Sequence, residues 1–278
     1  MAIFEASDKC KVFYEITGKG EPLFLVHGWT SNHNIFKENI PYFADNSYCV
    51  VTMDIRGHGE SDCGEVLETD NTFERAAADI KELCEYLNLK DVNLAGWSMG
   101  GQIVMAYLQE FGCENLRTLT IIDMVPKYFS DDEWKLGSCY IPDIPKEVYI
   151  LQMLKSVAFE WPEFVASFVT SVFPKENPNS EKIKWASDET MKNKAHCMIY
   201  GFLCMCMSDY REAMKKATVP VLLIEAERGC NPRELADWMD KTVPGKFTHV
   251  CIPDAGHAMF IEQRDLFNKT YHDWLLKA

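Results

Sequence analysis

The chain has 278 residues and is 47% hydrophobic, enough for one large core or for a core domain that carries a smaller insertion. Its formal net charge of −14 would repel a phosphate backbone, so we expect no nucleic acid partner. An apolar stretch of about 18 residues and a signal-peptide pattern at the start are both missing from the sequence. These features predict no membrane insertion and a cytoplasmic location.

Eleven cysteines are scattered along the sequence. Their odd number and the lack of a signal peptide favour reduced thiols over a disulfide framework. Cys204 and Cys206 form the tightest group, and only His196 and Cys197 lie nearby, without a spacing typical of metal sites. We therefore expect these cysteines to pack in the interior, and we predict neither a metal nor an organic cofactor.

Short apolar runs alternate along the chain with longer segments of helical period. The runs cover residues 22–28, 47–54, 91–98, 116–123, 219–226 and 247–257. Two helical segments carry clear apolar stripes: residues 73–87, after the possible N-cap Thr72, and the last segment from Phe260 to Leu275. This alternation predicts the α/β fold class, with a mostly parallel central sheet flanked by helices on both faces.

Residues 127–216 interrupt the alternation. The segment is helix-like, is broken by several prolines, and is too long for a loop between two strands. It is rich in large apolar side chains, including those of Trp134, Trp161, Phe168, Trp185, Phe202 and Met205. We predict an inserted helical cap over 127–216, and a core domain formed by residues 1–126 and 217–278.

One serine lies at a junction where chemistry is expected. The sequence "GWSMG" at 96–100 fits the pattern G-x-S-x-G, follows a predicted strand and precedes a helix-like run. Gly96, Gly100 and Gly101 would give the clearance that a sharp strand-to-helix turn needs. Such a turn would lift the hydroxyl of Ser98 above the sheet edge, beside the positive end of the helix. Ser98 is therefore a candidate nucleophile, although a serine there could also act only as an N-cap.

Three further motifs accompany this turn: "HGW" at 27–29, "DIRGHGES" at 54–61 and "AGHAMFIE" at 255–262. In this order and spacing, the four motifs resemble the α/β-hydrolase family, specifically its esterase and cofactor-free haloperoxidase-like branch. The resemblance covers nearly the whole chain outside the predicted cap. It implies a serine nucleophile, a histidine late in the chain as the base, and a cap that is mobile or that shapes the substrate site.

Acyl transfer requires a base beside the serine and donors for the oxyanion. A serine hydroxyl needs a base within hydrogen-bond reach, and His257, after the last predicted strand, is the candidate. Backbone N–H groups stabilise the negative charge that develops on the attacked carbonyl oxygen. By resemblance to the family, these donors are the amides of Met99, which follows the serine, and of Trp29. The indole of Trp29 could equally wall the pocket or simply pack in the core.

The acid that orients the histidine departs from the family pattern. Relatives of this kind carry an aspartate shortly after the strand that corresponds to residues 219–226, but Gly229 stands in that place in "EAERGCNP". Asp123 ends the preceding apolar strand, and its charge there would cost free energy unless an imidazolium paired with it. We predict Asp123 as the acid, with Glu227 and Glu225 as alternatives.

The other histidines are weaker candidates for a base. His27 and His58 lie in glycine-flanked turns, where we expect them to fix loops by hydrogen bonds. His196, His249 and His272 lie in predicted helices or on a strand. His33 follows the "HGW" loop and could face the pocket.

The sequence therefore predicts a serine hydrolase that acts on a carboxylic ester or a related acyl compound through a Ser98–His257–Asp123 triad. The cap's aromatic and methionine side chains suggest an apolar or aromatic small-molecule substrate, although they could instead only pack the cap onto the core. Two alternatives stay open: a cofactor-free dioxygenase of the same fold, in which the serine only positions the substrate, and a non-enzymatic ligand receptor. We expect a monomer or a homodimer.

Overall fold

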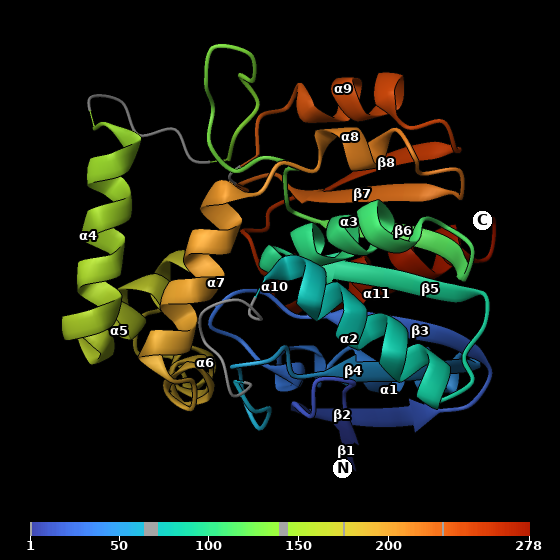
Figure 1. Ribbon diagram of the computed structural model, residues 1–278, viewed down its shortest axis with the longest axis horizontal. Coiled ribbons are helices and arrows are strands. Elements are labelled where there is room, and N and C mark those ends of the chain that lie inside the picture. Colours follow the sequence, from blue (N-terminus) through green and yellow to red (C-terminus); the bar gives the residue numbers. More distant parts are fainter. Residues whose placement is uncertain (1, 64–71, 139–143, 175, 230) are drawn as a thin grey trace.

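A single eight-stranded sheet forms the centre of the molecule in the computed structural model, which describes residues 2–63, 72–138, 144–174, 176–229 and 231–278. The strands lie in the order β1-β2-β4-β3-β5-β6-β7-β8 (Figure 1). Their bounds are Ala2–Glu5, Lys11–Gly18, Glu21–Val26, Tyr48–Met53, Val92–Trp97, Leu116–Ile122, Val221–Ala226 and Phe247–Ile252 for β1 to β8. Strands β3 to β8 are mutually parallel, which confirms the predicted α/β fold.

Strands β1 and β2 pair antiparallel at one end of the sheet and were not among the predicted strands. Strand β1 is the edge of the sheet and β2 lies between β1 and β4; both have charged residues inside or beside them, and much of each faces solvent. An edge strand that is half exposed lacks the near-continuous apolar run by which the buried parallel strands were identified. The apolar-run criterion therefore misses this antiparallel end of the sheet, although it finds the parallel edge strand β8 at the other end.

Helices cover both faces of the sheet. Figure 1 shows α2 (Phe73–Tyr86) and α3 (Met99–Phe111) in front of the sheet, and α1 (Ile40–Asp45) and α11 (Arg264–Leu275) behind it. The predicted N-cap of α2 is confirmed, because the Thr72 hydroxyl accepts a hydrogen bond of 3.1 Å from the Arg75 amide. Short elements complete the core: η1 (His33–Phe36), α8 (Arg211–Met214), α9 (Leu235–Thr242) and α10 (Met259–Glu262).

Four helices stand together beyond one end of the sheet and lie within the segment predicted as a cap, and we refer to this group as the cap: α4 (Lys146–Phe159), α5 (Trp161–Val172), α6 (Glu181–Met191) and α7 (Ala195–Met207) (Figure 1). The chain leaves and re-enters the core at one place, because Lys127 and Asp209 form an isolated antiparallel bridge. Next to this bridge, the Tyr210 amide donates to the Pro126 carbonyl at 2.9 Å. Helix α8 follows the bridge and packs on α3, so in space it belongs with the core.

A disulfide joins Cys63, in the loop after β4, to Cys197, in the first turn of α7. The expectation that all cysteines are reduced is therefore wrong for this pair. The two residues are separated by 134 positions, and only the folding of the cap back onto the core brings them together. Spacing along the sequence gives no sign of such a pair.

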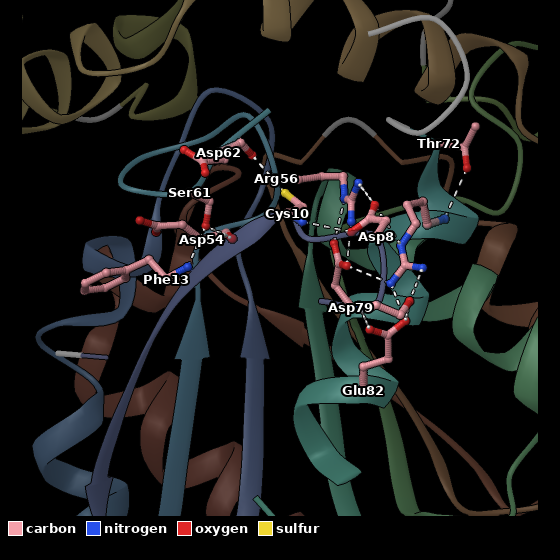
Figure 2. A network of polar contacts seen from close by, with 12 residues as sticks. Asp8, Cys10, Phe13, Asp54, Arg56, Ser61, Asp62, Thr72, Asp79 and Glu82 are labelled. Atoms are coloured by element: carbon pink, nitrogen blue, oxygen red, sulfur yellow. Dashed lines mark hydrogen bonds and ion pairs between the residues drawn. The ribbon is translucent and has the colours of Figure 1, made fainter. Parts of the chain in front are cut away.

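Polar contacts fix the loop between β4 and Cys63 (Figure 2). Arg56 donates two hydrogen bonds of 2.7 Å to the buried carboxylate of Asp79 on α2, and a third of 2.8 Å to Asp8. The Ser61 hydroxyl donates to the Asp54 carbonyl and accepts from the Phe13 amide of β2. The loop is thus held to the sheet on one side and to α2 on the other.

Among the described helices, none combines the length and the apolar composition needed to cross a bilayer.

Candidate active site

Ser98 lies at the turn between β5 and α3 with φ 54° and ψ −126°, a backbone conformation that costs free energy for any residue with a side chain. The position is that of the N-cap of α3, but the Ser98 side chain makes no capping hydrogen bond. The capping role is therefore excluded as the reason for a serine here. Strained residues cluster at functional sites, and Ser98 fits that pattern.

The glycines around Ser98 have the predicted role of clearance. A Cβ on Gly96 would lie 2.1 Å from the Gly100 carbonyl oxygen, and a Cβ on Gly100 would lie 2.5 Å from that of His27. Both contacts would be with backbone, which cannot move aside without moving β3 or α3. This tight packing holds Ser98 against the end of β3.

His257 and Asp123 meet directly beside this turn. His257 follows β8 and Asp123 follows β6, and the His257 Nδ1 lies 2.6 Å from the Asp123 Oδ2. The Asp123 side chain is 1% exposed and that of His257 is 20% exposed, so the acid is sealed while the imidazole still reaches the cavity. The Trp97 indole N–H donates to the His257 carbonyl at 2.9 Å and holds its loop against β5.

Gly229 leaves room beside His257 for the carboxylate that follows β6. A Cβ at position 229 would lie 2.7 Å from the Asp123 Oδ1 and 2.9 Å from its Oδ2. The carboxylate of Asp123 thus fills the space in which an acid on the loop after β7 would place its side chain. Two residues later, the Asn231 Nδ2 donates to the Asp123 Oδ1 at 3.3 Å, and its Oδ1 accepts from the Ser138 hydroxyl at 2.6 Å.

Asn231 and Ser138 were not among the predicted site residues. The available signal was weak: Asn231 is a polar residue in the same short stretch, "EAERGCNP", that lacks the usual acid. A side chain that supports the acid has to lie near it, but the identity of the acid was itself open. Ser138 belongs to the segment before α4, and nothing in its sequence context links it to β6.

The two alternative acids make other contacts. The Glu225 carboxylate is buried and lies 2.8 Å from the His249 Nε2 of β8. The Glu227 carboxylate accepts from the Asp254 amide at 2.7 Å. Both line a separate cavity of about 410 Å³ that also borders Gly229 and Asn231. The structure therefore brings Asp123, rather than Glu225 or Glu227, to His257.

The loop after β3 approaches Ser98 closely. A Cβ on Gly28 would lie 3.0 Å from the Ser98 Cβ, so the backbone of Trp29 starts beside the turn. Among the described residues, neither the Trp29 amide nor the Met99 amide has a protein acceptor. Two N–H groups without partners next to a serine can bind an oxyanion.

The indole of Trp29 connects this loop to the cap. Its N–H donates to the Met198 carbonyl of α7 at 2.8 Å. Its rings pack against Phe164 and Phe168 of α5 and Phe202 of α7, with centroid distances of 5.2–5.6 Å. Trp29 therefore lines the cavity and also anchors the cap.

A cavity of about 590 Å³ lies between the core and the cap, and Ser98, Asp123 and His257 open into it. Most of its wall is apolar and comes from Trp29, Met124, Tyr128, Tyr149, Met153, Phe164, Phe168, Val172, Phe202 and Met205. Serine hydroxyls and Asn231 supply the polar part, and no lysine or arginine lies among the described residues of the wall. The cavity suits an uncharged, largely apolar molecule.

His27, His58 and His33 make structural contacts. The buried His27 ring bridges two loops, since Nδ1 lies 2.8 Å from the Gly28 carbonyl and Nε2 accepts from the Ile55 amide at 3.0 Å. Burial lowers the pKa of His27 to about 4 and that of His58 to about 3, so both rings stay neutral near pH 7. His33 pairs with the buried Asp54 at 2.7 Å and does not line the large cavity.

Comparisons with known proteins agree with this architecture. The family model described as alpha/beta hydrolase fold matches residues 21–263. The chain is 25% identical to a non-heme chloroperoxidase of Kitasatospora aureofaciens over all of both chains. It is 22% identical to a pimeloyl-[acyl-carrier protein] methyl ester esterase of Nitrosomonas europaea, over 92% of this chain and 96% of the esterase. An esterase structure from Exiguobacterium antarcticum superposes with a TM-score of 0.87 at 26% identity, over 98% of each chain.

Proposed function

We propose that this chain, which belongs to the α/β hydrolase fold family and is a hydrolase, uses a serine nucleophile. The bond that it cleaves is a carboxylic ester or a related acyl bond. One observation carries the proposal. A strained serine without a capping role opens into the same cavity as a histidine whose Nδ1 is held by a sealed carboxylate. The names of the esterase relatives support it.

In the proposed first step, the Ser98 Oγ attacks the carbonyl carbon of the substrate. Because the Asp123 carboxylate holds Nδ1 of His257, the other ring nitrogen, Nε2, is left to take the proton from the hydroxyl. The imidazolium that forms is stabilised by the Asp123 charge. The amides of Trp29 and Met99 receive the negative charge of the tetrahedral intermediate.

His257 then returns the proton to the leaving alcohol, and the acyl group stays on Ser98 as an ester. In the second half of the reaction, water attacks this ester while His257 again acts as the base, and the carboxylic acid leaves. Neither half requires a metal or an organic cofactor.

The cavity wall supports an apolar or aromatic acyl or alcohol group on the substrate. The described part of the wall offers rings, methionines and hydroxyls, but no basic side chain that would pair with a substrate carboxylate. A cavity of about 590 Å³ also sets an upper size, within the range of small-molecule sites.

The test is labelling with a serine-directed phosphonate, followed by a panel of esters that varies acyl length and aromaticity. Wild type should label once, Ser98→Ala should not, and the variant should lose turnover by a factor on the order of 10⁶. Neutral aromatic or medium-chain esters should exceed esters with a charged acyl group in kcat/KM. Labelling that persists in Ser98→Ala would contradict the proposal.

The position of the acid after β6 also fits a second candidate function, that of a cofactor-free dioxygenase. The Ser98→Ala variant tests this candidate too. In that chemistry the His257–Asp123 pair removes a proton from a ring hydroxyl and the substrate anion reacts with oxygen, while Ser98 only positions the substrate. Oxygen uptake with a hydroxyquinolone-type substrate that survives Ser98→Ala, together with no ester turnover in wild type, would favour it. Tight, saturable ligand binding without turnover would favour a receptor.

A further inference from the structure

A group of metal-binding side chains lies outside the proposed active site, where α7 meets the loop after β4. It consists of Cys63, His196 and Cys197, whose ligand atoms all lie within 4.8 Å of one another. We propose that these three residues, with both thiols reduced, bind a thiophilic divalent cation such as Zn²⁺, and that the Cys63–Cys197 disulfide is the metal-free alternative state of the same site. The proposal is independent of the proposed hydrolase activity.

The donor set and its spacing fit such an ion. Two thiolates and one imidazole are ligands that Zn²⁺ prefers, at about 2.3 Å for sulfur and about 2.0–2.1 Å for nitrogen. A tetrahedral site with these bond lengths separates its donor atoms by roughly 3.6–3.8 Å. In this structure the two sulfurs are bonded to each other, and the three ligand atoms lie within 4.8 Å of one another. Reduction of the disulfide would have to let the sulfurs move apart to that separation, with the imidazole beside them. His196 is exposed and Cys63 is half-buried, so an ion can enter and a water can complete the coordination.

The two segments that carry the ligands are held together by contacts other than the disulfide. Asn193, just before α7, donates to the Thr30 carbonyl at 2.6 Å and accepts from the Gly59 amide at 2.9 Å. A Cβ on Gly57 would lie 2.9 Å from the Cys197 Cβ, so loop and helix are already in contact there. The site would therefore keep its shape when the disulfide is reduced.

The loop that carries Cys63 is rigid as well. The Gly57 amide donates to the Asp62 carbonyl at 2.9 Å, and the Asp62 amide donates to the Lys11 carbonyl of β2 at 2.8 Å. The Cys10 thiol also reaches the Asp62 carbonyl, at 3.4 Å (Figure 2). The nearby Arg56 charge, which would oppose a cation, is matched by Asp79 and Asp8. Preorganised ligands of this kind lower the cost of binding.

The two states exclude each other because both use the same sulfur electrons. When a small-molecule disulfide oxidises the site, the two thiolates form the Cys63–Cys197 bond and give up two electrons. The small-molecule disulfide takes these electrons and two protons from solvent and leaves as two thiols, and the cation is released. Either state ties α7 to the core loop, one residue before the Met198 carbonyl that holds Trp29.

The direct test is Zn²⁺ titration of the metal-stripped, phosphine-reduced full chain in competition with a chromogenic chelator. Wild type should take up one equivalent tightly, and protein oxidised with a small-molecule disulfide should not. Cys63→Ser and Cys197→Ser should lose this binding. His196→Ala should weaken it at least about tenfold. Because His196 is exposed and no part of the disulfide, this variant should fold and still oxidise normally.

Cys113→Ser is the matched control, because Cys113 is a half-buried cysteine outside the group. It should bind Zn²⁺ as wild type does. The proposal is overturned if reduced wild type takes up no tight equivalent. It is equally overturned if His196→Ala and Cys63→Ser bind as wild type does, or if oxidised protein binds as well as reduced protein. None of these readouts depends on ester turnover, so failure of the metal site and failure of the hydrolase proposal are separate results.

Discussion

The carboxylate of Asp123 occupies the space above Gly229, at a distance of 2.7 Å from where a Cβ on that glycine would be. The carboxylate after β6 can therefore take this position only because the residue after β7 has no side chain. A larger residue at 229 and a carboxylate at 123 in its present position exclude each other.

Gly229→Ala should lower activity more than stability. The new methyl group would push on the end of the Asp123 side chain, which can turn away, and Gly229 does not have a positive φ that would strain alanine. A displaced carboxylate no longer orients His257, so we expect kcat to fall about 10- to 100-fold with little change in KM or Tm. Steady-state kinetics and thermal unfolding measure this. Unchanged kcat would mean that the carboxylate position does not matter.

Asp123→Asn should lower kcat by about 10³- to 10⁴-fold, because an amide cannot stabilise the imidazolium of His257. Glu225→Gln and Glu227→Gln are the matched controls, since both carboxylates make contacts away from His257. We expect them to stay within a few-fold of wild type in ester hydrolysis. Collapse of either control, with near wild-type turnover in Asp123→Asn, would reverse the assignment of the acid.

Asn231→Ala should give a smaller loss, because it removes one donor from Asp123 while the contact with His257 remains. A hydrogen bond to a charged group contributes about 1.5–3 kcal/mol, and at 3.3 Å this one belongs at the lower end. We therefore expect kcat to fall roughly tenfold. Steady-state kinetics of ester hydrolysis and thermal unfolding measure the two effects, on kcat and on stability.

Ser138→Ala is the control for that variant, because Ser138 contacts Asn231 and reaches Asp123 only through it. Its effect on kcat should be smaller than that of Asn231→Ala. A kcat in Asn231→Ala that matches wild type, with lowered stability alone, would mean that Asn231 only packs.

His33→Gln should destabilise the fold in a pH-dependent way. Burial alone would lower the pKa of His33, but the hydrogen bond to Asp54 raises it above 6.5; the same contact keeps the pKa of Asp54 below 3.8 despite burial. The raised histidine pKa means that this stabilisation is fully present below pH 6.5 and lost as pH rises through the folded value. The lowered pKa of Asp54 means that the stabilisation from this pair is also lost in acid, as pH falls below 3.8.

We therefore expect His33→Gln to cost about 1.5–3 kcal/mol of unfolding free energy near pH 5.5 and clearly less at pH 9. Urea unfolding at the two pH values measures the difference. An equal loss at both would show that the ion pair does not contribute.

The sequence predicted the interior of this protein well because buried parallel strands and their helices have strong local patterns. The six predicted strands and the Thr72 cap all correspond to elements of the structure. The turn at Ser98 was also readable, since its glycines are adjacent in the chain. The catalytic roles of Ser98, His257 and Asp123 remain predictions, although the structure brings the three to one cavity.

What the sequence could not give depends on contacts between distant segments. Asn231 matters only because β6 and β7 are neighbours, and Cys63 meets Cys197 only because the cap folds back. The antiparallel strands β1 and β2 were missed because their half-exposed residues leave no long apolar run. Each omission reflects tertiary proximity or partial burial, which local patterns do not encode.

The bridge between Lys127 and Asp209 makes the cap an exchangeable module. Since the chain departs and returns at neighbouring points, the segment between them can change in length or be replaced without altering the order or register of the sheet. Such a replacement would alter the packing around Trp29 rather than the connectivity of the core. Under the proposed function, the same core could acquire a new substrate range through recombination or insertion at this junction.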